Sequence, residues 1–295
     1  MARTKMTAKR YRRVTTLTRF HLPREQEWPT WPVDHPNVHI GPLADVQGAW
    51  KLRVGRMVEE PEQAAYIIEW RDLSNLEDFL SSPACAQFLR NLPEEVSDSV
   101  KSSSSALGSL TLEDAPPAAS RFLILEEITH IPHGEVEGRI TLNAFLVAGK
   151  CVPSTGWPPY KALREVFGSF QPRGSEFIRG HGARWGARWQ QYKTTWFWVL
   201  AEDGWVESKF GKKSEPDQDR TVICEFHRWP REWGVTPEHE EASAADPQAR
   251  ESWNEAVAKV MPPVTAWVQE RWDIRKVPLF DPEEDIDLDD IEHEE

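Results

Sequence analysis

The sequence has little cysteine and no long apolar run. Its three cysteines, Cys85, Cys151 and Cys224, are widely spaced and form no CxxC pair. They therefore indicate neither a disulfide framework nor a zinc site. No apolar run approaches the ~20 residues that cross a bilayer, and no signal-peptide core is visible. We expect a soluble, cytoplasmic protein that has no membrane partner.

Several catalytic motifs are also missing. The sequence has no nucleophile elbow, no phosphate-cradling glycine loop, no Walker sequence and no metal-binding helix. These absences count against hydrolases, kinases and nucleotide-dependent oxidoreductases. We therefore predict no cofactor and no metal. A haem-binding enzyme stays open as a distant alternative, because a single axial histidine has no recognisable sequence pattern.

Charge is unevenly placed along the chain. The formal net charge is -13 over 295 residues, which argues against nucleic acid because phosphates would be repelled. Residues 1–13 are basic and no acid precedes Glu25, whereas residues 281–295 are mostly Asp and Glu. Such runs are usually solvated. We predict a flexible basic arm over 1–13 and a disordered acidic tail over 281–295; the arm as an organelle-targeting segment is the alternative.

Tryptophan is abundant, with fifteen residues. Each indole covers a large apolar area and needs one hydrogen-bond partner. A chain this rich in tryptophan either packs bulky side chains between helices and sheets or lines an apolar pocket. Core packing is the simpler interpretation.

Residues 64–92 predict a strand followed by a broken helix. Tyr66–Arg71 is a β-branched and aromatic run, which suits a half-buried strand. Asp72 and Ser74 can cap a helix. Pro83 lacks an amide hydrogen, so it is predicted to start a second helical piece. The helical stripe consists of Leu76, Phe79, Leu80, Phe88, Leu89 and Leu92.

A later stretch, residues 221–272, repeats this order. Val222–His227 aligns with Tyr66–Arg71 and keeps the step from glutamate to an aromatic residue, Glu225-Phe226 against Glu69-Trp70. Two copies of one pattern indicate a duplicated unit. The second predicted helix is interrupted at Pro262-Pro263 and carries Trp253, Ala256, Val257, Val260, Val264, Trp267 and Val268.

The remaining predicted strands divide the chain into two consecutive units. In Val14–Leu22, Leu17, Arg19 and His21 alternate with Thr16, Thr18 and Phe20, which face the other way. We predict a first unit over 14–113, a linker over 114–119 and a longer second unit over 120–280. The other predicted elements are strands at 50–58, 107–112, 122–131, 140–147, 195–200 and 272–278 and a helix at 160–167, with 122–131 as the counterpart of the first strand.

The strand ending Ile68-Glu69-Trp70 and the helix with Phe79, Ser82-Pro83 and Phe88 resemble the dimeric α+β barrel superfamily. Within it they are similar to antibiotic-biosynthesis-monooxygenase-like fungal proteins. The resemblance covers residues 46–112 best and 120–280 less closely. It implies an α+β fold in which two ferredoxin-like units with antiparallel sheets form an intramolecular pseudo-dimeric barrel. Members include cofactor-free oxygenases, isomerases, cyclases, decarboxylases and haem-dependent enzymes, and no catalytic motif carries over position by position.

Two glutamates are the first catalytic candidates. Glu69 and Arg71 share one strand face, and Glu225 and His227 match them in the second copy. If the apolar residues of both strands lie under helices, both glutamates look into the barrel, where burial raises a carboxyl pKa and suits acid or base work. Exposure, or ion pairing with the neighbouring arginines, is the alternative.

Histidine provides a further candidate at the end of strand 122–131. His130 shares a face with Glu126, and an imidazole held by a carboxylate can remove or deliver a proton. A strand-end histidine satisfied by backbone is the ordinary alternative. His133 could join His130 on a metal, but Pro132 separates them and no third ligand is evident.

The segment GARWGARW, residues 182–189, repeats with a period of four. On a helix it aligns Arg184 with Arg188 and Trp185 with Trp189. Paired guanidiniums beside indoles can hold a carboxylate or phenolate of an aromatic ligand, and His181 lies close by in sequence. A surface helix that stacks arginine on tryptophan is the alternative.

Trp196, Phe197 and Trp198 place an aromatic side chain on each side of a strand. One face must be core, so we expect the other to line a cavity. The sequence thus predicts a cofactor-independent enzyme, monomeric or homodimeric, acting on a hydrophobic or aromatic small molecule inside the barrel. It would be of isomerase, cyclase or monooxygenase type. A non-catalytic binding or assembly protein of the same fold is the alternative.

Overall fold

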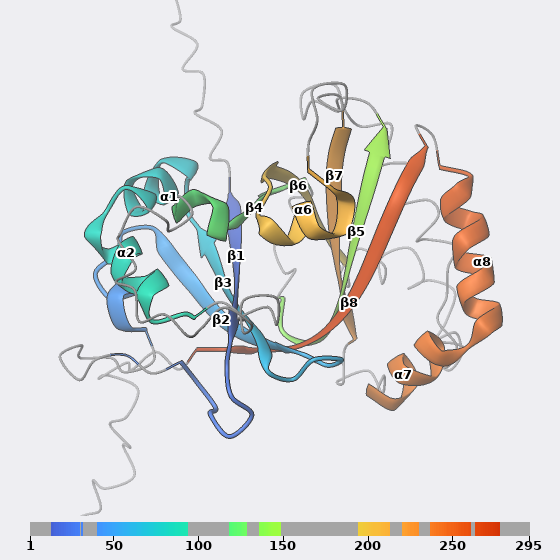
Figure 1. Ribbon diagram of the computed structural model, residues 1–295, viewed down its shortest axis with the longest axis horizontal. Coiled ribbons are helices and arrows are strands. Elements are labelled where there is room, and N and C mark those ends of the chain that lie inside the picture. Colours follow the sequence, from blue (N-terminus) through green and yellow to red (C-terminus); the bar gives the residue numbers. More distant parts are fainter. Residues whose placement is uncertain are drawn as a thin grey trace, which may run out of the picture.

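The computed structural model describes residues 13–29, 31, 40–93, 118–128, 136–148, 194–212, 220–229, 237–260 and 263–277. In these residues eight antiparallel strands close into one barrel, in the order β1-β3-β2-β8-β5-β7-β6-β4 (Figure 1). The strands are β1 (Val14–His21), β2 (Ala49–Met57), β3 (Gln63–Trp70), β4 (Leu123–Glu127), β5 (Gly138–Ala148), β6 (Thr194–Ala201), β7 (Arg220–Trp229) and β8 (Val264–Lys276).

Helices cover the outside of the barrel and one of its ends. They are α1 (Leu73–Leu80), α2 (Pro83–Arg90), α6 (Gly204–Phe210), α7 (Pro237–Ala245) and α8 (Pro247–Ala258), with short 3-10 turns η1 (Gly41–Leu43) and η2 (Ala118–Arg121). None of these described helices is long and apolar enough to cross a membrane. The predicted arm, tail, strand 107–112 and helix 160–167 lie outside the described residues.

The strand order divides the barrel into two quartets of the same pattern. Along the barrel, β4-β1-β3-β2 is followed by β8-β5-β7-β6, so each quartet runs fourth, first, third, second. The pairings β2–β8 and β4–β6 join the quartets. The prediction that strand 122–131 is the counterpart of the first strand was wrong. β4 takes the fourth position beside β1, and β5 takes the first position in the second quartet.

The helix break at Pro83 is confirmed. The Asp72 carboxylate accepts a hydrogen bond from the Ser74 amide at 3.2 Å, so Asp72 caps α1. The Ser82 hydroxyl accepts from the Cys85 amide at 3.3 Å and caps α2, which starts at Pro83. Two short helices therefore replace one long one, because proline fits the first turn of a helix but not its interior.

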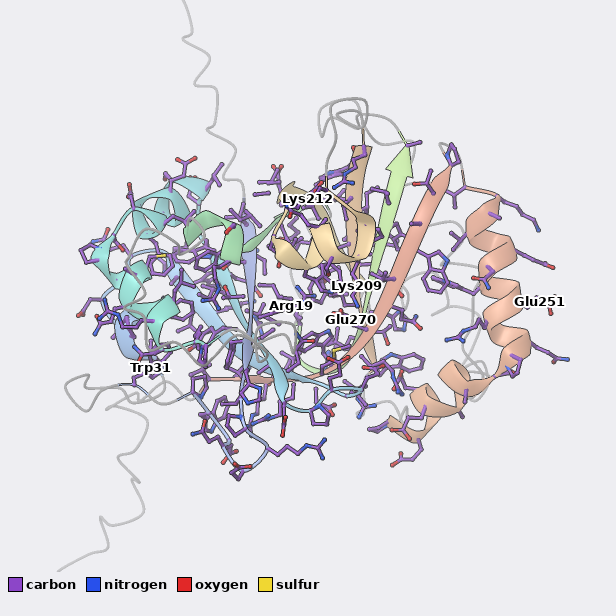
Figure 2. All side chains as sticks on the ribbon, viewed as in Figure 1. Arg19, Trp31, Lys209, Lys212, Glu251 and Glu270 are labelled. Carbon is purple, nitrogen blue, oxygen red and sulfur yellow. The ribbon has the colours of Figure 1, made fainter. Side chains whose placement is uncertain are left out.

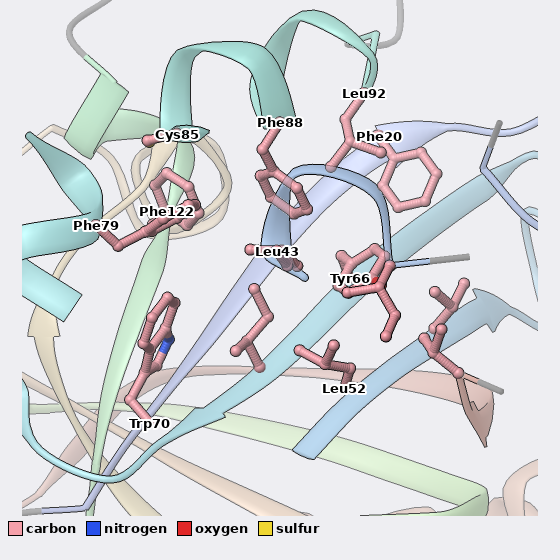
Figure 3. Close-up of a cluster of buried hydrophobic side chains, with 14 of the residues drawn as sticks. Phe20, Leu43, Leu52, Tyr66, Trp70, Phe79, Cys85, Phe88, Leu92 and Phe122 are labelled. Carbon is pink, nitrogen blue, oxygen red and sulfur yellow. The ribbon is translucent and has the colours of Figure 1, made fainter. Parts of the chain in front are cut away.

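An outer aromatic cluster lies between the first quartet and its helices (Figure 3). Phe88 of α2 is fully buried and stacks on Trp31 at a ring-centroid distance of 5.5 Å. Tyr66 meets Phe88 edge to face at 5.3 Å. The cluster includes Val14, Phe20, Leu52, Val54, Tyr66, Ile68, Trp70, Leu76, Phe79, Phe88 and Phe122. The alternate residues of β3 thus lie under helices, as its pattern predicts.

The barrel interior holds a second apolar cluster. Leu17 of β1 lies in it, while Phe20 belongs to the outer cluster, which confirms the predicted alternation of that strand. An eight-stranded barrel is just wide enough for side chains to fill. The interior cluster includes Leu17, Met57, Ala65, Ile67, Leu123, Leu125, Ile140, Leu142, Ala144, Phe197, Val222, Cys224, Phe226, Trp272 and Ile274.

A second outer cluster lies where α8 packs on the second quartet, along the outer side of β8 (Figure 1). It consists of Phe145, Val147, Trp196, Trp198, Ile223, Trp253, Val257 and Val260, with Trp267 partly buried against it. The predicted helix was too long: α8 ends at Ala258, and Val264, Trp267 and Val268 lie on β8. The prolines at 262 and 263 cannot donate helical hydrogen bonds, and the β-branched residues after them favour a strand.

Candidate functional site

The barrel interior contains a buried ion cluster. Arg19 of β1 reaches across to Glu270 of β8, and the two are labelled near the middle of Figure 2. Arg19 Nη2 donates to Glu270 Oε2 at 3.0 Å, and Arg19 Nη1 lies 3.5 Å from Asp203 Oδ2. Asp203 also caps α6 by accepting from the Val206 amide at 3.0 Å. The cluster therefore connects β1, β8 and the start of α6.

Two indoles complete this cluster. The Nε1 groups of Trp205 and Trp272 donate to the two oxygens of Glu270, at 2.5 and 3.2 Å. The Arg19 guanidinium also lies over the Trp205 ring, 4.0 Å from its centroid. Burial raises the Asp203 pKa, and Arg19 opposes that rise. Burial raises the pKa of the interior Cys224 thiol as well. The carboxylates and indoles of this cluster are hydrogen-bonded to one another or to Arg19, while the Arg19 Nε donates to no group among the described residues.

Glu69 lies on the interior face of β3, in line with Ala65 and Ile67. It is ion-paired there. Arg53 Nη1 donates to Glu69 Oε1 at 2.7 Å, and Lys51 Nζ lies 3.5 Å from Oε2. Arg71, the arginine named from sequence, is exposed just after β3. The catalytic role of Glu69 and the substrate-binding role of Arg71 stay predictions.

Glu225 does not look into the barrel, which corrects the expectation that both glutamates would. Val222, Cys224 and Phe226 of β7 lie in the interior cluster, and Ile223 lies in the outer cluster under α8. Glu225 and His227 alternate along β7 with the three interior residues, so they share the outer face with Ile223. The apolar residues of β7 face inward, whereas the matching residues of β3 face its helices. Positions that align between the two strands therefore face opposite sides of the barrel wall.

Glu225 is nonetheless fully buried, with no exposed surface. Asn143 Nδ2 of β5 donates to Glu225 Oε2 at 2.7 Å, and Gln269 Nε2 of β8 donates to Asn143 Oδ1 at 2.9 Å. From the residues that the structure describes, Glu225 Oε1 accepts no hydrogen bond. The two amide side chains therefore fix one oxygen of the carboxylate. The other oxygen can still accept a hydrogen bond, and leaving a buried carboxylate oxygen without a donor costs free energy.

His227 lies close to that oxygen. Its Nδ1 lies 3.6 Å from Glu225 Oε1, longer than a hydrogen bond but close enough for an ion pair when the imidazole is protonated. The Trp229 ring packs edge-on against the imidazole at a centroid distance of 5.1 Å. The His227 side chain is 22 % exposed. A buried carboxylate thus lies behind an imidazole that solvent can reach, and this pair is the candidate site.

Trp196 and Trp198 lie on the same outer face and are core residues. Trp196 is paired in register with Glu225, and Trp198 with Ile223. Both indoles are buried under 6 % exposure, and Phe197 is buried in the barrel interior. The expectation that one face of this strand is free to line a cavity was wrong, because all three aromatic side chains are packed.

The remaining predicted residues are only partly placed. Glu126 lies on β4, buried to 8 % exposure and paired in register with Val14 and Trp198. His130, His181, Arg184 and Trp185 lie outside the described residues. The pairing of His130 with Glu126 and the arginine-tryptophan site therefore stay predictions.

Sequence reasoning missed Asn143, the residue that fixes Glu225. A polar side chain inside the strand Gly138–Ala148, which is otherwise largely apolar, was the available signal, because buried polar groups need partners. It also missed the Arg19–Glu270 contact, which spans 251 positions of sequence. Over the stretches of chain that the structure describes, no three His, Cys, Asp or Glu side chains come together as a metal site.

Comparisons with known proteins add a general likeness. No protein-family model matches the chain. No curated protein matches it either. The structure is similar to that of an anthrone oxidase-like protein, with 12% identity and a TM-score of 0.44 over 90% of this chain and 94% of that one. Two bacterial proteins described as "putative monooxygenase" also match. The one from Lactobacillus acidophilus has 8% identity and a TM-score of 0.37, over 89% of this chain and 94% of that chain. The one from Fusobacterium nucleatum has 6% identity and the same TM-score, over 91% and 94%. Likeness at this level assigns no reaction to the chain.

Proposed function

We propose that the protein is a cofactor-independent enzyme that moves a proton to or from a hydrophobic or aromatic small molecule. Glu225 and His227 are the residues proposed to do this. The observation that carries the proposal is a fully buried carboxylate with one oxygen fixed by Asn143 and the other oxygen 3.6 Å from the imidazole nitrogen Nδ1 of His227.

The chemistry follows from the roles of the two side chains. A carboxylate behind Nδ1 favours the tautomer with hydrogen on Nδ1, and this leaves Nε2 as the basic nitrogen. Nε2 then accepts a proton from an acidic C–H or O–H of the ligand, and Glu225 stabilises the imidazolium that forms. The separation is 3.6 Å without a ligand, and we expect it to shorten when a ligand binds, as catalytic contacts do in many enzymes.

The aromatic surroundings of the imidazole suit an aromatic ligand. The Trp229 ring lies against the His227 ring at a centroid distance of 5.1 Å, and an aromatic ligand is the class that would pack beside such a pair. Trp196, Phe145 and Trp253, further along the outer face, are buried against one another and support the site from behind. Proton removal from an activated aromatic or keto compound is the common first step of the isomerase, cyclase and cofactor-free monooxygenase types.

The structure also gives an observation in favour of the second candidate, a non-catalytic binding or assembly protein. The barrel interior is occupied by the indoles of Trp272 and Trp205 and by the ion cluster around Arg19. An interior packed with these side chains fits a structural role. The chemistry proposed for Glu225 and His227 lies on the outer face of β7, outside this interior.

Two measurements distinguish the enzyme from the non-catalytic binding or assembly protein. Native mass spectrometry of the protein from its source would identify a ligand that travels with it. Turnover of that ligand by Glu225→Gln and His227→Ala is then compared with His21→Ala, a control histidine at the end of β1. We expect a loss of about 10²–10⁴-fold in kcat for both site variants and wild-type turnover for the control.

A structural readout keeps the test independent of the ligand. The ¹⁵N spectrum of His227 reports its tautomer, and Glu225→Gln is expected to reduce the population with hydrogen on Nδ1. Urea unfolding checks that both variants remain folded. The catalytic assignment fails if turnover survives in both site variants, or if the tautomer is unchanged in Glu225→Gln.

A further inference from the structure

Arg53 is a buried arginine that has two of its three guanidinium nitrogens unpaired among the described residues. It lies on the interior face of β2 with 1 % of its side chain exposed. Its Nη1 donates to Glu69 at 2.7 Å, but Nε and Nη2 donate to no group in the described part of the chain. Donors on a buried charged group are costly to leave unpaired. This edge of the guanidinium is therefore poised to gain from a partner.

Arg139 shows what the same edge binds elsewhere in this chain. Its Nε and Nη2 donate to the two oxygens of Asp273 at 2.8 and 3.1 Å, while Nη1 donates to Glu240 at 2.9 Å. Arg139 and Arg53 thus both use Nη1 for a glutamate. At Arg139 the Nε–Nη2 edge carries a bidentate carboxylate, and at Arg53 it carries none.

The charges around Arg53 suit a monoanion. Lys276 of β8 is its partner in register, and Lys51 shares the interior face two residues closer to the start of β2. Two carboxylates offset these cations: Glu69 contacts Arg53 and Lys51, and Glu137 lies 3.5 Å from Lys276. Three cations against two anions leave one positive charge, which matches a carboxylate and not a phosphate dianion.

Exposure indicates the direction of approach. It rises from 1 % at Arg53 through 18 % at Glu69 and 31 % at Lys51 to 62 % at Lys276. In the other direction, the next residue on the same face is Gly55, where an added Cβ would lie only 2.9 Å from Ile274 Cγ1. Side chains are tightly packed on that side of Arg53. A ligand therefore reaches Arg53 from the side that carries the two lysines, and these lysines must shift to admit it.

We propose that the Nε–Nη2 edge of Arg53 is a binding site for the carboxylate of a small monocarboxylate molecule. The site is separate from Glu225 and His227, and it does not depend on the function proposed above. A second source of the same chemistry is the acidic run 281–295 of the chain itself. The Val277 amide donates to Leu52 O at 3.0 Å, so the chain leaves β8 beside Arg53.

The test follows the Nε–Hε signal of Arg53 by NMR in the full chain while benzoate is added. Its loss in Arg53→Lys assigns the signal, because lysine keeps the charge but lacks the fork. We expect a saturable shift with benzoate and none with benzamide or inorganic phosphate. Arg53→Lys should weaken benzoate binding, measured by calorimetry, by about tenfold or more. Arg139→Lys, whose fork is already occupied, should bind benzoate as the wild type does.

A variant with Asp281, Glu283 and Glu284 changed to amides distinguishes the two sources. If the acidic run occupies the edge, this variant shifts the Arg53 signal without any ligand and binds benzoate more tightly. If a free molecule is the partner, the variant behaves as the wild type. The proposal is overturned if neither benzoate nor this variant moves the Arg53 signal, or if benzoate binds equally well to Arg53→Lys.

Discussion

Replacing Glu270 by glutamine tests whether the interior ion cluster holds the barrel closed. Glu270 is 3 % exposed and accepts hydrogen bonds from Arg19, Trp205 and Trp272. Glutamine has nearly the same shape but no charge, and it has one acceptor oxygen in place of two. The change therefore leaves a buried guanidinium with only Asp203, at 3.5 Å, as its counter-ion.

The magnitude follows from these contacts. Removing one partner of a buried ion pair costs about 3–5 kcal/mol, and leaving one indole N–H unpaired costs about 1–3 kcal/mol. Because Asp203 still neutralises part of the Arg19 charge, we expect a loss of about 3–4 kcal/mol in the free energy of unfolding. Urea unfolding followed by tryptophan fluorescence measures this loss, since Trp205 and Trp272 lie in the cluster.

An exposed ion pair is the matched control. Glu62 lies 3.9 Å from Arg24, and their side chains are 56% and 68% exposed. Glu62→Gln should change stability by less than about 0.5 kcal/mol. A cost below about 1 kcal/mol for Glu270→Gln, or one equal to that of Glu62→Gln, would show that the cluster does not hold the barrel together.

Two further predictions concern packing and pH. Gly55→Ala should destabilise the fold by about 1–3 kcal/mol, because the new Cβ would lie 2.9 Å from Ile274 Cγ1; thermal unfolding checks this against Gly204→Ala in α6, where a Cβ meets nothing within 4 Å and the change should not destabilise. Burial raises the pKa of Asp203 in the folded protein above its ordinary value of 3.8. The stability that the protonated carboxyl contributes is therefore fully present below pH 3.8, and it is lost as the pH rises through the pKa of the folded protein. The stability of the wild type relative to Asp203→Asn, measured by urea unfolding between about pH 4 and about pH 6, should therefore fall as pH rises, and a constant difference would contradict the assigned cause.

Several local features of this protein are determined by sequence alone. The caps at Asp72 and Ser82, the restart at Pro83 and the alternating faces of β1 all follow from chemistry within a few residues. Cap residues satisfy the first amides of a helix, and successive side chains of a strand must point to opposite sides. These interactions need no distant partner, so the pattern of residue types is enough to predict them.

Tertiary structure decided which face of each strand is the interior. In β3, Tyr66, Ile68 and Trp70 lie under helices. In β7 the matching residues, Val222, Cys224 and Phe226, lie in the barrel interior, and Glu225 turns outward. The alternation of side chains shows that a strand has two faces. In a barrel covered by helices both faces are apolar, so only the long-range pairing of strands determines which face is the interior. Contacts such as Arg19 with Glu270 depend on the closure of β2 on β8 and of β4 on β6, which brings together residues far apart in the chain.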